Sequence, residues 1–191
     1  MKWIGENIWD LVSRFRNTVY FEGDVEFNTD TVTFQSANED DPIVTIKNTS
    51  NDANEMASLN FVKDRDGGTA ATNDNLGEIY FSGEDASGNF QEYSRILSEI
   101  DVATHGQESG RLKLGVANHD GGNGYGLILT GGSADNEVDV TVGFGAASVT
   151  TVAGDLTTTG DVVMMANLPT SDPENAGQLW NDSNTLKISA G

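Results

Sequence analysis

The chain has 191 residues, with 10 Lys and Arg against 30 Asp and Glu, so its formal charge at neutral pH is −20. This balance argues strongly against a nucleic-acid binder, because phosphate contacts need clustered cations, and against binding to anionic membranes for the same reason. There is no cysteine, which excludes disulfides and thiolate metal sites. No apolar run approaches the roughly 20 residues of a membrane span, so no membrane insertion is expected.

Residues 1–17 are predicted to form a helix that assembles or anchors the protein. Four apolar residues in this segment are spaced four, three and four positions apart, which is the seam of two heptads. A helix of roughly 14 residues is marginal alone in water, so it needs a partner: its own copies, a larger structure, or the body of the domain. The residues predicted to make these contacts are Trp3, Ile4, Ile8, Trp9, Leu11 and Phe15.

Residues 18–41 are predicted to form a stalk of very short strands. The pattern Val-x-Phe occurs three times, and period-2 alternation puts each Val and Phe on one face. Units this short bury little alone, and three of them are too few for a free-standing solenoid. We therefore expect several chains to wind around a shared axis, each supplying one apolar face. The predicted stalk core consists of Val19, Phe21, Val25, Phe27, Val32 and Phe34.

Residues 42–152 are predicted to form the folded β core. Alternating apolar and polar residues mark the strands, and clusters of Gly, Asn and Asp mark the turns. Residues 93–100 fit either a long strand or a helical turn, and the flanking β pattern favours a strand. Many strands at regular intervals suggest a β-sandwich or a jelly roll. The expected strands include residues 43–46, 59–61, 79–81, 93–100, 112–116, 127–129 and 138–142.

Residues 153–191 are predicted to form a second short-strand segment and a hairpin. A Gly-Asp-apolar start occurs at residues 154–156 and again at 160–162, as it does in the first stalk at 23–25. The hairpin is expected from residues 177–180 and 185–188, with a turn at residues 181–184. The whole chain is therefore predicted to be mainly β, with one short N-terminal helix.

Several stretches resemble structural proteins of tailed bacteriophages. The C-terminal LPTSDPENAGQLWNDSNTLKIS is similar to an ending found on tail-fibre and other structural proteins of these phages. The stretches VTIKNTSNDANEMASLNFVKDRDGG, GEIYFSGEDASGNFQEYSRILSEIDVATHGQESGRLKLGV and VDVTVGFGAASVTTVAGDLTTTGDV resemble fibre-type virion proteins, especially those of marine phages. The resemblance covers most of the chain. It implies an elongated homotrimer in the virion, in contact with other proteins of the capsid or tail.

Two functions are consistent with this resemblance. The first is a structural one, a short fibre or a head-fibre or decoration protein attached through the N-terminal helix. The alternative is a fibre tip that binds a receptor or host surface glycan during adsorption. Exposed aromatics in distal loops would mark such a tip, and the best candidate is the glycine-rich loop with Asp120, Asn123 and Tyr125.

No catalytic constellation or cofactor motif is found, so an enzyme is not expected. Residues 64–68 invite a calcium interpretation, but an EF-hand loop needs Gly at its sixth and Glu at its twelfth position. This chain has Thr69 and Asn75 there, so a plain turn is favoured and calcium is a minor alternative. His105 and His119 are the two histidines, too few for a three-histidine zinc site within one chain.

Overall fold

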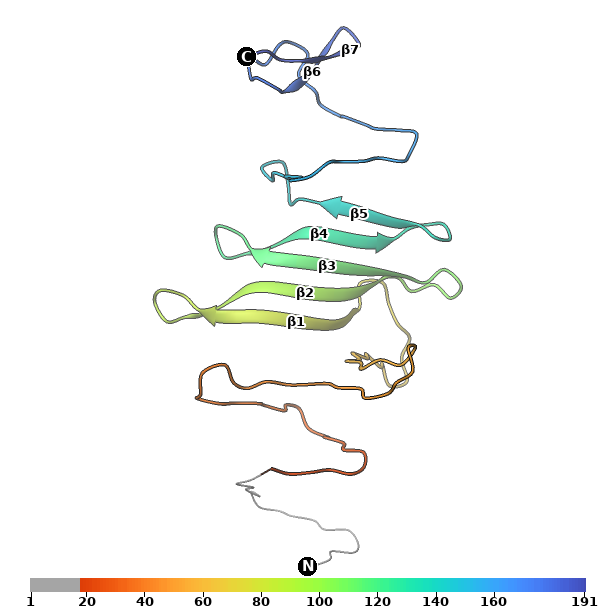
Figure 1. Ribbon diagram of the computed structural model, residues 1–191. Coiled ribbons are helices and arrows are strands. Elements are labelled where there is room, and N and C mark those ends of the chain that lie inside the picture. The colour runs from red at the N-terminus through yellow and green to blue at the C-terminus, as the bar shows by residue number, and fades with distance from the viewer. Residues whose placement is uncertain (1–17) are drawn as a thin grey trace, which may run out of the picture. The chain divides into compact units, whose positions relative to one another are not determined.

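The computed structural model describes residues 18–191, so the helix predicted at residues 1–17 lies outside the described part. The described chain is mainly β, as predicted, and no helix occurs in it. Five consecutive strands form one antiparallel sheet in the order β1-β2-β3-β4-β5, and β6 pairs with β7 (Figure 1). The chain divides into two units, one up to Asn60 and one from Phe61 to Gly191. Both sheets belong to the second unit.

The larger sheet is a meander whose strands follow the alternating segments of the sequence. Residues 93–100 lie within its second strand, so the strand interpretation of that segment is confirmed. Positive φ angles occur in each of the four connecting turns, at Gly88, Gly106, Gly121 and Asn136. Gly and Asn adopt this conformation readily, which explains why they mark the turns. The strands are β1 (Asn75–Glu84), β2 (Phe90–Val102), β3 (Ser109–Ala117), β4 (Asn123–Gly131) and β5 (Val138–Val142).

The C-terminal hairpin consists of β6 (Leu179–Asp182) and β7 (Thr185–Ile188). Ser183 and Asn184 both have positive φ, 53° and 72°, as a two-residue type I′ turn requires. The hairpin is therefore confirmed, with a tighter turn than the four residues expected. Beyond its second strand the hydroxyl of Ser189, 3% exposed, donates a 2.5 Å hydrogen bond to Asp172 Oδ1. This bond lowers the pKa of the Asp172 carboxyl.

Two of the strands expected from alternation, residues 43–46 and 59–61, do not pair with any described strand. Their backbone is unpaired although the residue pattern is that of a strand. Residues 18–60 form one backbone–backbone hydrogen bond among themselves, from Glu55 N to Asp52 O at 3.3 Å. Alternation predicts an extended segment with one apolar side, but a β-strand also needs a neighbour to hydrogen-bond. One copy of the described chain provides no such neighbour here.

The five-stranded sheet is a single layer within the described chain. Leu97, in the middle of β2, is 3% exposed and is the one buried large apolar side chain among residues 18–191. A sandwich or jelly roll needs a second sheet packed against the first. The described residues of one copy supply one such sheet, so the second layer predicted from the sequence is not found among residues 18–191. None of the described segments has the length and apolarity of a membrane-spanning helix.

Phe61 lies on Gly77 at the start of β1. A Cβ atom built on Gly77 would be 2.6 Å from Phe61 Cβ, closer than real Cβ atoms come to other atoms. Gly126 in β4 has open space where its Cβ would be. The two glycines therefore provide a matched pair for testing the contact.

We expect Gly77→Ala to displace Phe61 and to lower the free energy of unfolding by about 1–3 kcal/mol, the usual range for overpacking. Gly126→Ala should leave it within about 0.5 kcal/mol of the parent. Denaturant unfolding followed by circular dichroism measures both. Equal midpoints for the two variants would show that Phe61 does not lie on Gly77.

Candidate functional site

The two faces of the five-stranded sheet differ sharply in chemistry. Residues directly opposite each other on neighbouring antiparallel strands share a face, so the pairing register assigns each side chain. We call one side the charged face, because Asp, Glu, Lys or Arg residues lie on it in four of the five strands. Its members are Glu78, Tyr80, Glu92, Arg95, Leu97, Glu99, Arg111, Lys113, Tyr125, Ile128, Asp139 and Thr141.

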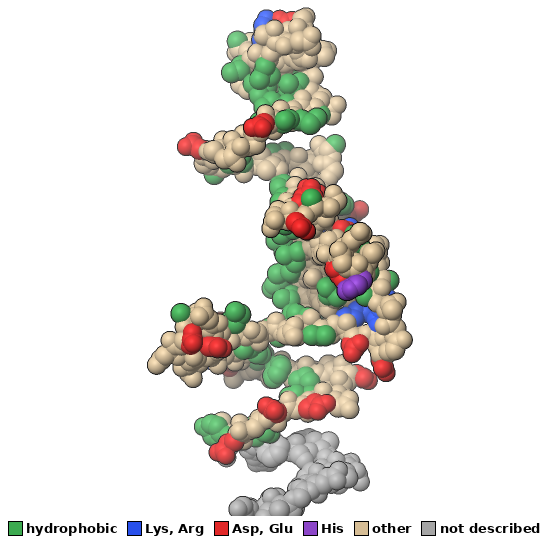
Figure 2. All heavy atoms as spheres, turned by 90° about the vertical axis from the view of Figure 1, so that its right-hand side faces the viewer, with side chains coloured by type: hydrophobic (Ala, Val, Ile, Leu, Met, Phe, Trp, Pro, Cys, Tyr) green, Lys and Arg blue, Asp and Glu red, His purple; other side chains and the backbone are tan. Residues whose placement is uncertain are grey.

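The opposite side, the apolar face, carries no charged side chain in the paired strands. Ile79, Leu112 and Leu114 are still 37–39% exposed, and Val140 is 57% exposed, because nothing in the described chain covers them. Figure 2 shows the hydrophobic side chains gathered along one side of this sheet. The members of the apolar face are Ile79, Phe81, Ile96, Leu112, Leu114, Val116, Leu127, Leu129, Val138, Val140 and Val142.

Arg95 is the centre of one ion-pair cluster on the charged face. Its guanidinium binds Glu92 through two hydrogen bonds, Nε to Oε1 at 2.5 Å and Nη2 to Oε2 at 2.7 Å. It also lies 3.7 Å from Glu78 Oε2 and 5.0 Å from the centre of the Tyr80 ring. The hydrogen bonds from Arg95 lower the pKa of Glu92, and those to Glu92 raise the pKa of Arg95. Both side chains thus stay charged around neutral pH.

Glu99 is the centre of a second cluster, next to the first on the same face. It forms an ion pair with Lys113 Nζ at 2.6 Å and accepts a hydrogen bond from Arg111 Nη1 at 3.5 Å, and Arg111 also pairs with Asp101. Lys113 Nζ lies 5.1 Å from the centre of the Tyr125 ring, a cation–π distance. Networks of partly exposed ion pairs suit a surface that stays in contact with water.

The three residues of the predicted ligand loop do not lie together in the structure. Asp120 lies in the β3–β4 turn, where its Oδ1 accepts from Gly122 N at 3.3 Å. Asn123 and Tyr125 lie in β4 and meet Arg95 on the charged face. The Tyr125 hydroxyl is 3.4 Å from Arg95 Nη1, and the Asn123 amide, oriented to satisfy both neighbours, reaches Arg95 and Glu92 at 3.2 and 3.3 Å. Asp120 is therefore not part of this cluster.

Sequence reasoning missed Arg95 as the partner of Tyr125, and it missed Glu92 and Tyr80 as partners of Arg95. The signal that could have found them is the polar half of each alternating strand. Glu78 and Tyr80 alternate with Ile79 and Phe81 in β1, and the same period applies to the charged residues of β2 and β3. Which of them become neighbours depends on the strand register, and bulges shift that register within three of the four strand pairs.

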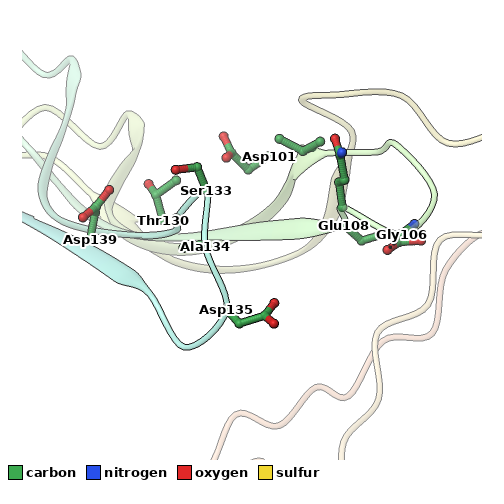
Figure 3. Close-up of a pocket in the computed structure, with 12 residues that line it drawn as sticks. Asp101, Gly106, Glu108, Thr130, Ser133, Ala134, Asp135 and Asp139 are labelled. Carbon is green, nitrogen blue, oxygen red and sulfur yellow. Dashed lines mark hydrogen bonds between the residues drawn. The ribbon is translucent and has the colours of Figure 1, made fainter.

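An acidic hollow of about 670 Å³ lies between the β2–β3 and β4–β5 loops. In Figure 3, Asp101, Thr130 and Ser133 gather at one end, whereas Asp135 points away from them. Glu108 accepts a 2.9 Å hydrogen bond from Gly106 N, and backbone N–H groups lower the pKa of Glu108. Within residues 18–191, no three His, Cys, Asp or Glu side chains are grouped so that they could hold a metal ion.

A turn closes at residues 65–68. Gly68 N donates to Arg65 O at 2.5 Å, and Gly67 has a φ of 72°. Arg65 of this turn pairs with Asp74, which also accepts a hydrogen bond from Ala71 N at 2.9 Å. The Ala71 N–H, followed by Arg65, lowers the pKa of Asp74.

The structure does not bring the predicted stalk core residues together within one chain. Their exposed fractions run from 42% to 68%, so no core forms around them in a single copy. The predicted assembly residues of the N-terminal helix lie outside the described residues. The stalk set is Val19, Phe21, Val25, Phe27, Val32 and Phe34, and the helix set is Trp3, Ile4, Ile8, Trp9, Leu11 and Phe15.

Comparison with protein-family models gives no match for this chain, and no curated protein matches it. Its function is therefore inferred from the sequence, from the unpaired extended segments and from the two faces of the sheet.

Proposed function

We propose that the chain is a structural component of a bacteriophage virion. It is a trimeric short fibre, or a head-fibre or decoration protein, attached to other virion proteins of the capsid or tail through residues 1–17. The assignment to a phage particle rests on the sequence resemblance to virion proteins. The single observation that carries the proposal is the long extended backbone that has no hydrogen-bonding partner in one copy.

Two extended segments show this deficit. Residues 18–60 form one backbone–backbone hydrogen bond, and residues 149–168 form none. Both segments expose apolar side chains in alternation, for example Phe27 at 66% and Val149 at 88%. Backbone amides and carbonyls that carry apolar side chains are normally paired within a protein. Chains wound around one axis would pair this backbone and bury these side chains at once.

The number of copies follows from the sequence rather than from a contact in the structure. The two-heptad seam of the helix predicted at residues 1–17 would provide a way to start an assembly and set its register. The resemblance to trimeric fibre proteins favours three copies. Neither a catalytic group nor a bound cofactor is needed for such a role.

Light scattering on the purified protein in neutral buffer tests the proposal. We expect one main species with three times the chain mass of 20.3 kDa, about 61 kDa. If the main species is a 20.3 kDa monomer, the shared-axis proposal is wrong. If the protein is a trimer, electron microscopy of particles that carry a labelled copy would show whether it is attached to the capsid or to the tail.

The second candidate function is a receptor- or glycan-binding tip. The observation that favours it is the Arg95 cluster, where Tyr80, 53% exposed, and Tyr125 lie beside hydrogen-bonding groups on the charged face. Rings beside polar groups can bind sugars by stacking and hydrogen bonding. Isolated host surface glycan should bind a tip protein and should not bind a purely structural one.

A further inference from the structure

We infer that the apolar face of the five-stranded sheet is the contact surface between three copies of this chain, whose sheets enclose a common three-sided core. The inference deepens the proposed function and rests on it. The sequence had assigned assembly to the N-terminal helix and the short-strand stalk, and had expected residues 42–152 to fold as a core within one chain. In this proposal the five-stranded sheet is also part of the interface between copies.

The apolar face is continuous across all five strands. The register places Ile79 opposite Ile96, continues through Leu114 and Leu127, and ends at Val142. The chain itself places two aromatic rings on glycines of this face, Phe61 on Gly77 and Phe144 on Gly124. The other side chains of this face are exposed or half-buried in one copy. A contiguous apolar surface of this kind marks an interaction site in a soluble protein.

The sizes of the side chains on this face favour three sheets over two. Two sheets face to face leave a gap of nearly constant depth, about 10 Å. Three sheets around an axis leave a space that is deep opposite the middle of each strand and shallow at the corners. Large residues therefore fit the strand centres, and small ones fit the ends. Two strands follow this order at both ends of the apolar face, Gly77-Ile79-Phe81-Gly83 in β1 and Gly124-Leu127-Leu129-Gly131 in β4. The third, Gly110-Leu112-Leu114-Val116 in β3, follows it at one end.

The distribution of charge decides which face turns inward. Burying an unpaired charge is costly, and the paired strands place their charges on the other face. Three copies packed through the apolar face would keep the Arg95 and Glu99 clusters in water. The opposite orientation would bury ion pairs from all three copies, whose desolvation often outweighs their attraction.

The partner that covers the apolar face is another copy of the same chain. This follows from the two extended segments on either side of the sheet in the sequence. Residues 18–60 come before it and form one backbone–backbone hydrogen bond in one copy, and residues 149–168 come after it and form none. Chains that wind together before and after the sheet necessarily hold their sheets side by side. A foreign partner would have to satisfy all three regions, whereas identical copies do so with one set of residues.

Cysteine labelling tests this interface directly, because the chain has no cysteine of its own. Val140 and Thr141 are adjacent in β5, point to opposite faces and are both exposed in a single copy. Val140→Cys and Thr141→Cys are therefore matched probes. In the assembled protein we expect maleimide to label Val140→Cys roughly tenfold or more slowly than Thr141→Cys, and at equal rates after unfolding.

The result separates this inference from the proposed function. Protection of Val140→Cys in a 61 kDa species, with free labelling of Thr141→Cys, supports the three-sided core. Equal labelling in a species of that mass overturns the interface and leaves the trimeric fibre in place. Equal labelling in a monomer overturns both. A second pair, Val142→Cys on the apolar face and Ile128→Cys on the charged face, repeats the comparison at another position.

Discussion

Replacing Leu127 with Asp is expected to prevent assembly, whereas replacing its neighbour Ile128 with Asp is expected to leave it intact. Leu127 lies in the central row of the apolar face, between Leu114 and Val142. Three copies would bring three carboxylates into one apolar core, at an effective cost of several kcal/mol for each buried ion. Ile128 lies on the charged face opposite Lys113, where a new carboxylate meets water and a cation.

The two variants add the same charge at adjacent positions of β4, so they differ mainly in the face they alter. Light scattering should give a monomer or a heterogeneous aggregate for Leu127→Asp and the parent mass for Ile128→Asp. Circular dichroism provides the control, because Ile128→Asp should keep the parent strand signal. Assembly of both variants to the parent mass would remove the apolar face from the interface.

The positions of β1 to β5 could be predicted from sequence because two independent signals agree there. Alternation marks the strands, and Gly or Asn at positive φ marks the turns. Residues 43–46 have the alternating pattern but no partner strand among the described residues. There the pattern predicted an extended segment correctly, but not a β-strand. For the same reason the sequence does not show what forms the second layer of the predicted sandwich, since alternation shows that a face is apolar and not what covers it.

The candidate site was predicted less completely than the strands. Asn123 and Tyr125 were named, and both lie at the Arg95 cluster. Asp120, three residues before the start of β4, forms the turn instead. Arg95 lies 30 residues from Tyr125 along the chain and reaches it through the β2–β3–β4 pairing. A pattern read along one strand gives the face of a residue, but its neighbours across strands depend on bulges that composition does not show.

Thermal stability of the assembled protein is expected to rise with NaCl, with most of the gain at low concentration. A trimer would carry a formal charge of three times −20, that is −60. The exposed turn carboxylates Asp24, Asp155 and Asp161 would recur in every copy around the shared axis. The Debye length falls from about 30 Å at 0.01 M to about 8 Å at 0.15 M, so salt would screen their repulsion. A gain of about 1 kcal/mol shifts the melting temperature by about 2–4 °C in chains of this size.

Melting in NaCl and in CaCl₂ at equal ionic strength then separates screening from cation binding. Screening alone acts through ionic strength, so the two melting curves should coincide. A cation held by the folded state and not by the unfolded chain would stabilise further, by RT ln(1 + [L]/Kd). Millimolar calcium would then raise the melting temperature above the matched NaCl value, and a chelator would reverse the shift. Melting temperatures that fall as NaCl is added would contradict the close packing of like charges and, with it, the shared axis around which the acidic turns are placed.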